Sequence, residues 1–251
     1  MIPLDVVIVP DHLAHFVLER SAVVVIDVLR ATTSIAVALH SGARGILPIM
    51  TVEEAIRISG NMRRDGESVL LCGEVGGLPP EGFDLGNSPR EFVPERVLNR
   101  RIMLKTTNGT VALVRSQTAR YVLAGALVNL SAVAEFLHSH LESDSLDRIL
   151  CVCAGREGDF SLEDFFTAGG IVDRLQDLYR SRFDLGDSAV AALEYFQSHR
   201  DNPLAVLEQS RHGRVLKGLG LGADLPACAA YDSYPVVPLC GSEGWIEKAE
   251  I

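Results

Sequence analysis

Residues 23–34 read VVVIDVLRATTS, and this stretch decides the class of fold. Four β-branched apolar residues in a row, Val23–Ile26, are typical of a strand that is buried between helices. The polar ATTS that follows predicts the start of a helix, because Thr and Ser can satisfy its first N–H groups. A strand that passes directly into a helix indicates an α/β protein.

The same alternation of a short apolar run and an amphipathic stretch recurs along the first two-thirds of the chain. The predicted strands are Asp5–Val9, Ala22–Ile26, Gly45–Ile49, Ser68–Cys72, Arg101–Lys105, Arg120–Ala124 and Arg148–Cys153. The predicted helices are Thr32–His40, Val52–Arg64, Pro89–Leu98, Gly109–Ser116, Ser131–His140 and Leu162–Arg180. This pattern predicts a layered α/β/α fold with a mixed, largely parallel sheet.

From about Ser188 the pattern changes to successive helices, with a small predicted strand at Tyr234–Pro238. No Ser-, Gly- or Pro-rich linker separates this helical C-terminal region from the rest. We therefore expect a single domain over residues 1–251. The alternative is two intimate lobes, an α/β core over about 1–185 and a helical appendage over about 186–251.

The bulk composition narrows the class of function. The chain has 251 residues, 47% of them hydrophobic, and a net charge of −10, which suits a folded core and disfavours nucleic acid as a partner. No apolar run approaches the roughly 18 residues of a membrane span, so we expect no membrane contact. The five Cys stand mostly in apolar context and are typical of reduced thiols in a cytoplasmic protein.

Four segments carry candidate site residues, and each begins where a predicted strand ends. In the first, Asp27 can hold a cation or attack phosphorus, and Arg30 can grip a phosphate with two parallel bonds. Thr32 and Thr33 lie at a helix start that suits an anion. The alternative is that Asp27 caps a turn and Arg30 is a surface cation.

The second segment reads CGEVGGLPPEGFDLGNSP. Its carboxylates Glu74 and Asp84 suit a hard cation, which prefers oxygen ligands. Asn87 and Ser88 can bind substrate, and the glycines permit close approach of the backbone to a ligand. The alternative is a solvated loop without a ligand.

The third segment reads MLKTTNGTVALV. Lys105 ends a strand, and the turn before the next helix holds Thr107, Asn108, Gly109 and Thr110. Hydroxyl, amide and backbone N–H groups of this turn can point at one oxyanion. The alternative is helix capping without a ligand.

The fourth segment reads LCVCAGREGDFSLEDFFTAGG. Glu163 and Asp164 lie in the first turn of a predicted helix, and Ser161 stands three residues before Asp164, as in a capping box. Acids are common at such positions for structural reasons. That is the alternative to a role in catalysis or metal binding.

The four segments meet if the strands are parallel neighbours, because ligands of open α/β sheets bind outside the carboxyl ends of the strands. Several carboxylates, an Arg, a Lys and three polar helix starts suit metal-assisted phosphoryl transfer. Haloacid-dehalogenase-type phosphatases carry a second Asp two residues after the first, where this chain has Leu29. The sequence therefore disfavours that class of phosphatase. The Gly218–Gly222 run follows a helical stretch, which disfavours a dinucleotide site, and the scattered His residues disfavour zinc.

The motifs DVLRATTS, GFDLGNSP, TTNGT and CAGREGDFSLED, in this order, resemble the signature of the 2-phosphosulfolactate phosphatase (ComB) family. The similarity spans roughly Asp27–Gly169, and SRHGRVLKGLG with DLPACAAYD resembles the C-terminal part of the family. The resemblance implies a ComB-like α/β fold and Mg²⁺-dependent hydrolysis of a 2-phospho-3-sulfocarboxylate to sulfolactate and phosphate, a step associated with coenzyme M formation. It also implies a basic residue after the acid of the Gly-Glu motif, where this chain has Val75.

We therefore predict a Mg²⁺-dependent phosphatase acting on 2-phosphosulfolactate or a related 2-hydroxy-acid phosphate. The predicted catalytic residues are Asp27, Arg30, Glu163 and Asp164, and the metal ligands are drawn from Asp27, Glu74, Asp84, Glu163 and Asp164. The predicted substrate-binding residues are Thr32, Thr33, Asn87, Ser88, Lys105, Thr107, Asn108, Gly109 and Thr110.

Two chemical routes stay open for this predicted enzyme: attack by Asp27 through an aspartyl-phosphate, or attack by a metal-bound water. A non-catalytic binder of small sulfonates or phosphates is the alternative from a different class of protein. The expected partner is a small anionic phosphate ester, and a homodimer is one assembly to test.

Overall fold

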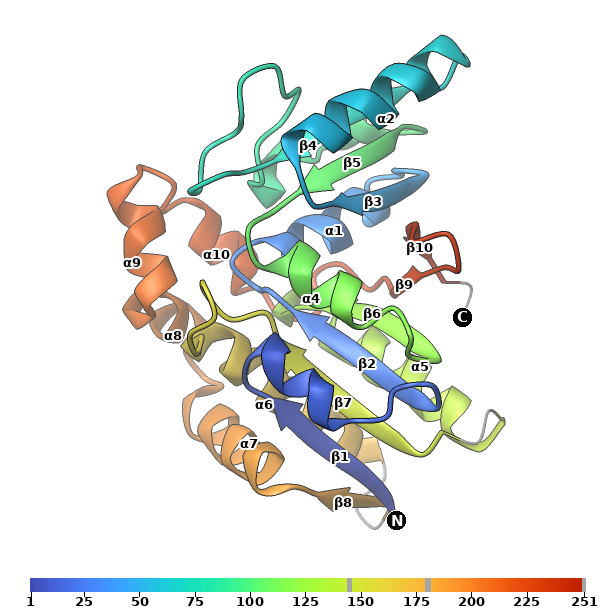
Figure 1. Ribbon diagram of the computed structural model, residues 1–251. Coiled ribbons are helices and arrows are strands. Elements are labelled where there is room, and N and C mark those ends of the chain that lie inside the picture. The colour runs from blue at the N-terminus through green and yellow to red at the C-terminus, as the bar shows by residue number, and fades with distance from the viewer. Residues whose placement is uncertain (144–145, 179–181, 250–251) are drawn as a thin grey trace.

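The computed structural model describes residues 1–143, 146–178 and 182–249. Within them, ten strands form one sheet in the order β4-β5-β3-β10-β9-β6-β2-β7-β1-β8 (Figure 1). The strands are β1 Ile2–Val7, β2 Ser21–Ile26, β3 Gly45–Ile49, β4 Val69–Gly73, β5 Arg101–Lys105, β6 Tyr121–Gly125, β7 Arg148–Cys153, β8 Phe183–Leu185, β9 Pro238–Cys240 and β10 Ile246–Lys248.

Ten α-helices and three short 3₁₀ helices accompany this sheet in the described chain. They are η1 Pro10–His15, α1 Ala31–His40, α2 Val52–Arg64, η2 Pro89–Glu91, α3 Pro94–Val97, α4 Gly109–Arg115, η3 Leu127–Asn129, α5 Leu130–Ser143, α6 Leu162–Leu178, α7 Asp187–His199, α8 Pro203–Gln209, α9 Arg211–Gly218 and α10 Asp224–Cys228. None of the described helices combines the length and apolarity that a membrane span needs.

Two parallel groups of strands make up most of the sheet. One consists of β4, β5 and β3, and the other of β6, β2, β7, β1 and β8. The short strands β9 and β10 pair antiparallel with each other, with β6 and with β3, and so join the two groups. The C-terminal region therefore contributes to the sheet as well as to the helices beside it.

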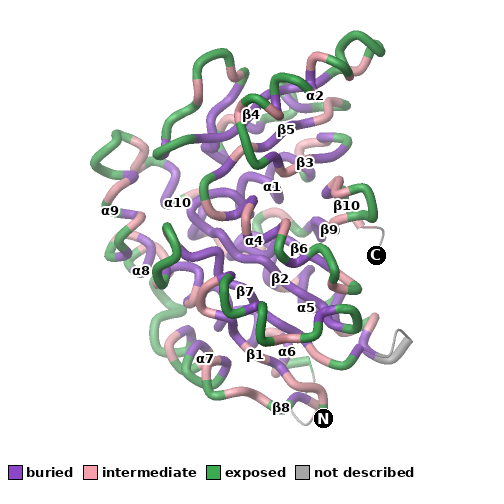
Figure 2. The backbone as a smooth tube through the Cα atoms, in the orientation of Figure 1, coloured by how far each residue is buried: buried purple, intermediate pink, exposed green. Residues whose placement is uncertain are grey.

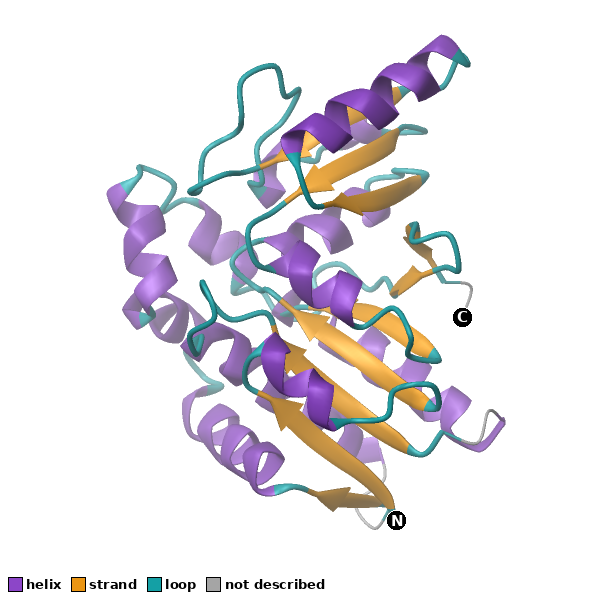
Figure 3. Ribbon diagram, in the orientation of Figure 1, coloured by secondary structure: helices purple, strands orange, loops and turns teal. Residues whose placement is uncertain are grey.

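Helices cover both faces of the sheet (Figure 3). The central strand β2 is buried along its whole length (Figure 2), and its side chains alternate between two layers, as the period of a strand requires. Val23 and Val25 pack in one apolar cluster with Leu113 of α4, whereas Val24 and Ile26 pack in another with Phe166 of α6. The layered α/β/α fold with a largely parallel sheet is confirmed.

The predicted elements differ from the observed ones mainly at their ends. The predicted helix at residues 89–98 is instead two short turns, η2 and α3, because Pro94 cannot continue a helix and begins a new one. The helix predicted to run to Arg180 is described only to Leu178, so Arg180 lies outside the described residues. The strand predicted at residues 234–238 was placed too early, since β9 begins at Pro238.

Helices α9 and α10 lie on the side of the sheet to which the arrowheads of β2, β5 and β7 point (Figure 1). The loops that follow these strands run towards the same side. Segments that are far apart in the sequence are therefore gathered at the carboxyl ends of the strands, where ligands of α/β sheets bind.

Candidate active site

A cavity of about 100 Å³ lies at this edge of the sheet. Loops that follow four strands, β2, β4, β5 and β7, form its lining together with helix α9. The lining residues are Asp27, Leu29, Arg30, Glu74, Gly76, Gly77, Asn87, Thr107, Asn108, Arg156, Glu157, His212 and Val215. The four segments singled out in the sequence thus meet in one place.

Asp27 follows β2 directly and is 7% exposed. Burial, together with the negative charges of Glu74 and Glu163, raises the pKa of Asp27 to about 7. Backbone N–H groups of Ala31 and Gly109, the first residues of α1 and α4, act in the opposite sense by hydrogen-bonding the carboxylate. Near pH 7 this carboxyl group is poised between its neutral and charged forms.

The glycine at position 109 is required by its distance to Asp27. A Cβ atom there would lie 2.7 Å from Oδ2 of Asp27 and 2.8 Å from Cβ of Ala31, which is closer than such atoms pack. The turn before α4 can therefore approach the carboxylate only without a side chain at this position.

Glu163 and Asp164 at the start of α6 are also buried, 4% and 2% exposed. Burial is the main cause that raises the pKa of each, and for Asp164 the charges of Asp27 and Glu163 add to it. Asp164 accepts hydrogen bonds from the backbone N–H groups of Val28 at 2.9 Å and Gly155 at 3.2 Å. It therefore ties the end of β2 to the end of β7.

The predicted capping box at the start of α6 is present in part. The hydroxyl of Ser161 accepts a hydrogen bond from the N–H of Asp164 at 3.3 Å, as a helix cap does. Both the structural and the functional readings of these acids therefore have support in the geometry.

Arg30 is buried at 3% exposure and is held on two sides. Its Nη1 donates to Asp224 of α10 at 2.8 Å, and its Nη2 donates to the carbonyl of Gly77 at 2.9 Å. Asp224 also accepts a 2.6 Å hydrogen bond from the hydroxyl of Ser88. A helix from the C-terminal region thus fixes two residues that the sequence predicts for the site.

Glu74 joins the loop after β4 to the loop after β5. Its Oε1 accepts from the N–H of Thr107 at 2.8 Å and from the Thr107 hydroxyl at 2.9 Å, while its Oε2 accepts from the N–H of Gly77 at 2.6 Å. Asn108 continues this chain of contacts, because its Oδ1 accepts from the N–H of Glu157 at 3.0 Å. The cavity wall is held together by these polar contacts.

Three buried side-chain atoms of the described residues have no hydrogen-bond partner: Nε of Arg30, Oδ1 of Asn87 and Nδ1 of His212. All three residues line the same cavity. Buried polar groups are almost always paired, because an unpaired one costs about 1–3 kcal/mol. Their coincidence at one cavity indicates that a bound molecule completes these contacts.

The other predicted site residues lie around the cavity without lining it. Thr32 accepts from the N–H of Asp27 at 3.1 Å, and Thr33 donates to the carbonyl of Val28 at 2.8 Å. Thr110 and Thr106 share a hydrogen bond of 3.0 Å between their hydroxyls. These hydroxyl groups support the turns on which Asp27 and Asn108 stand.

Asp84 and Lys105 point elsewhere. Asp84 accepts from the N–H of Leu71 at 2.8 Å and forms an exposed ion pair with Arg63 at 3.0 Å. Lys105 donates to the carbonyl of Thr106 at 3.0 Å. The structure therefore does not bring Asp84 to the cavity that Asp27 and Glu74 line.

Sequence reasoning missed three contributors, Arg156, His212 and Asp224. Arg156 stands in the CAGREGD motif, and the other two stand in the C-terminal motifs SRHGR and DLPAC, so the signal was present in the resemblance. Burial, together with the charges of Arg156 and Arg30, lowers the pKa of His212 to about 4. Its ring is therefore neutral near pH 7.

The carboxylates around the cavity form a small set of possible metal ligands. The described residues contain no group of three or more His, Cys, Asp or Glu arranged to hold a metal. Mg²⁺ is commonly held by only one or two carboxylates together with substrate phosphate and water. Asp27, with Glu74 or Glu163 near enough to repel it, fits that smaller requirement.

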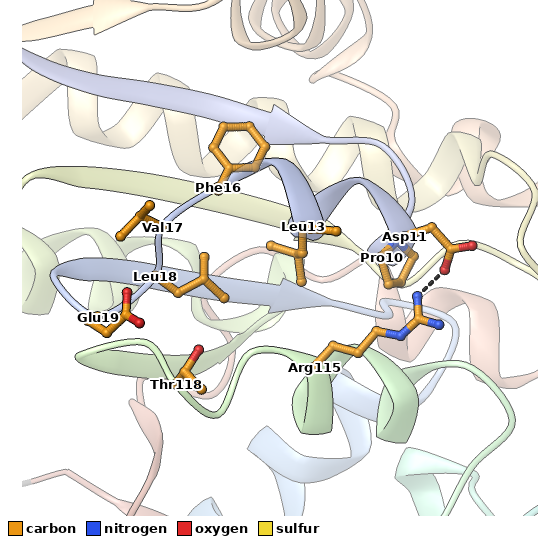
Figure 4. Close-up of a pocket in the computed structure, with 10 residues that line it drawn as sticks. Pro10, Asp11, Leu13, Phe16, Val17, Leu18, Glu19, Arg115 and Thr118 are labelled. Atoms are coloured by element: carbon orange, nitrogen blue, oxygen red, sulfur yellow. Dashed lines mark hydrogen bonds and ion pairs between the residues drawn. The ribbon is translucent and has the colours of Figure 1, made fainter.

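A larger hollow of about 660 Å³ lies between η1 and α4 (Figure 4). Leu13, Phe16 and Val17 give its wall a largely apolar character, and its charged residues are Glu19 and the exposed ion pair of Arg115 with Asp11. None of the unpaired buried atoms of the described residues lies there. Size alone therefore does not mark the site.

Comparison with known proteins adds an independent finding. Residues 7–243 match the family described as 2-phosphosulpholactate phosphatase. Curated relatives named "Probable 2-phosphosulfolactate phosphatase" include one from Thermotoga petrophila, 43% identical over 88% of this chain and 89% of its own. Others come from Synechococcus sp., 44% identical over 86% and 88%, and from Carboxydothermus hydrogenoformans, 38% identical over 99% and 95%.

Proposed function

This chain belongs to the 2-phosphosulpholactate phosphatase family, and on that premise we propose that it hydrolyses 2-phosphosulfolactate, or a closely related 2-hydroxy-acid phosphate, with the help of Mg²⁺. The observation that carries the proposal is the cavity itself. It collects Asp27, whose pKa is raised to about 7, and all three unpaired buried atoms of the described residues.

The cavity offers the groups that phosphoryl transfer needs. Nε of Arg30 is a free donor for an anionic oxygen, and the guanidinium is held in place by Asp224 and Gly77. Asp27, with Glu74 or Glu163, would hold Mg²⁺, which when bound would neutralise charge on the phosphoryl oxygens. Asp164 fixes the relative positions of the loops after β2 and β7.

Asp27 has two possible roles in this proposal. In the first, its carboxylate oxygen bonds to phosphorus while the ester P–O bond breaks, and water then hydrolyses the aspartyl-phosphate. In the second, water attacks phosphorus directly while the ester P–O bond breaks, and the role of Asp27 would be limited to holding Mg²⁺. Acid-quenched protein from a reaction under turnover should carry a phosphoryl group on Asp27 in the first case and none in the second.

The test of the proposal is release of inorganic phosphate from synthetic 2-phosphosulfolactate, with Mg²⁺ and with EDTA. We expect release that requires Mg²⁺ and that the Asp27→Asn variant lacks. Binding of the ester without release under any metal condition would contradict the proposal and favour the non-catalytic anion binder. Release of phosphate that does not require a metal would contradict the role of Mg²⁺ but would still support hydrolysis of the ester.

A cellular location and an assembly are part of the same proposal. We place the enzyme in the cytoplasm, where its buried cysteines would stay reduced, and cell fractionation would test this. The homodimer is tested by sedimentation of the purified protein.

A further inference from the structure

The two cations that line the cavity, Arg30 and Arg156, differ in what already neutralises them. Arg30 forms a buried ion pair with Asp224, with side chains 2% and 3% exposed. Arg156 takes part in none of the ion pairs found among residues 1–143, 146–178 and 182–249. Arg156 is half-buried, and among the described residues no carboxylate lies within ion-pairing distance of it although the chain has a net charge of −10.

The backbone holds Arg156 firmly at the cavity wall. Arg156 and Asp159 exchange two backbone hydrogen bonds of 2.9 Å across a tight turn. The residues between them, Glu157 and Gly158, have positive φ of 53° and 86°, as a hairpin turn of this kind requires. The N–H of Glu157 also donates to Asn108 at 3.0 Å, which ties the turn to the neighbouring loop.

Arg156 reaches the cavity from the loop after β7, whereas Asp27 and Arg30 belong to the segment after β2. The charges with the largest effect on the pKa of Asp27 come from Glu74 and Glu163. The charge of Arg156 lowers the pKa of Glu163 of α6 and, together with the charge of Arg30, the pKa of His212 of α9. Arg156 is therefore a second cation at the cavity, close to Glu163 and His212.

We propose that Arg156 forms a subsite for a second anionic group of the substrate, a sulfonate or carboxylate, separate from the phosphoryl group beside Asp27 and Arg30. The inference rests on the proposed function, because the ester named there carries such groups in addition to its phosphate. An unpaired guanidinium binds a sulfonate or carboxylate through charge-assisted hydrogen bonds. His212, whose Nδ1 has no hydrogen-bond partner among the described residues, lines the same cavity.

Binding of two probes tests the subsite without requiring catalysis. Calorimetry of the full-length protein with Mg²⁺ would compare sulfolactate with inorganic phosphate. For Arg156→Gln we expect sulfolactate affinity to fall about 10- to 100-fold, the effect of losing one charged hydrogen bond, and phosphate affinity to fall at least tenfold less. The sulfolactate affinity of Arg156→Lys should lie between those of Arg156→Gln and the parent, because Lys keeps the charge but lacks the planar guanidinium.

Arg211→Gln is the matched control. Arg211 pairs with Asp159 of the same turn at 3.5 Å, but both side chains are more than two-thirds exposed and Arg211 does not line the cavity. It loses the same charge next to the same turn, so both probes should bind it as they bind the parent.

Three results would overturn the subsite. These are equal losses for both probes in Arg156→Gln, no loss for sulfolactate, or no binding of sulfolactate to the parent protein. Failure of the proposed function looks different: sulfolactate binding would depend on Arg156 while the parent released no phosphate from the ester. Conversely, hydrolysis by the parent with unchanged sulfolactate affinity in Arg156→Gln would keep the function and reject the subsite.

Discussion

Replacing Asp27 with Asn should stabilise the fold at neutral and alkaline pH while it abolishes turnover. The pKa of Asp27 is raised from its usual 3.8 to about 7 by burial and by two neighbouring carboxylates. This difference of about three corresponds to roughly 4 kcal/mol that ionisation of the carboxyl costs the folded protein. The Asn side chain has nearly the same shape and does not ionise.

The sign of the pH dependence follows from the raised pKa. A group that holds its proton more tightly when folded contributes stability that is complete below about pH 4 and is lost as the pH rises through about 7. The Asp27→Asn variant would also lose one acceptor for the N–H groups of Ala31 and Gly109, which costs about 1–2 kcal/mol at every pH. The advantage of the variant should therefore grow by roughly 3–4 kcal/mol between pH 4 and pH 8, to a net gain of about 2 kcal/mol at pH 8.

Urea unfolding in EDTA at pH 4, 6 and 8 measures this difference, because a bound cation would offset part of the repulsion. Exposed Asp65 at the end of α2 supplies the control. Asp65→Asn should stay within about 0.5 kcal/mol of the parent at all three pH values. An Asp27→Asn variant whose stability relative to the parent does not change with pH would refute the reasoning.

Single contacts support three more predictions. Asp224→Asn should lower the free energy of unfolding in urea by about 3–5 kcal/mol, since it leaves Arg30 buried without its partner. In the control Asp147→Asn, which breaks an exposed ion pair, the same titration should show a loss under about 1 kcal/mol. Gly109→Ala should lower kcat/KM at least about tenfold by displacing Asp27. The control is Gly60→Ala in α2, where the new methyl group would meet no atom within 4 Å; it should stabilise the helix by about 0.5–1 kcal/mol. Mg²⁺ affinity measured by calorimetry should rise about tenfold per pH unit from pH 5 to 7, because Asp27 must release its proton; a flat profile would exclude it as a ligand.

The sequence predicts the long strands and the edge where the site forms, for a clear physical reason. A buried parallel strand such as β2 is a continuous apolar run, and its polar continuation must emerge at the carboxyl edge. Asp27, Glu74 and Thr107 are brought together by that rule alone. Strands β8, β9 and β10 have three residues each, which is too short for a periodic pattern to show.

Placement of single side chains depends on contacts that no local pattern records. Asp84 shares a loop with Glu74, but the loop turns back so that the N–H of Asp84 donates to the carbonyl of Leu71 at 2.8 Å. His212 and Asp224 reach the site only because α9 and α10 pack across the carboxyl ends of the strands. Such long-range packing separates the residues that look functional in the sequence from those that line the cavity.

The charges around the cavity are only partly balanced within the protein. Arg30 and Asp224 neutralise each other inside the protein, so their pair needs nothing from outside. Burial and mutual repulsion raise the pKa values of Asp27, Glu163 and Asp164, and the charge of Arg156 only partly offsets this at Glu163. A fold gains no stability from such a cluster. We therefore expect a bound cation to supply the missing positive charge, and its binding would recover the free energy that folding loses at Asp27.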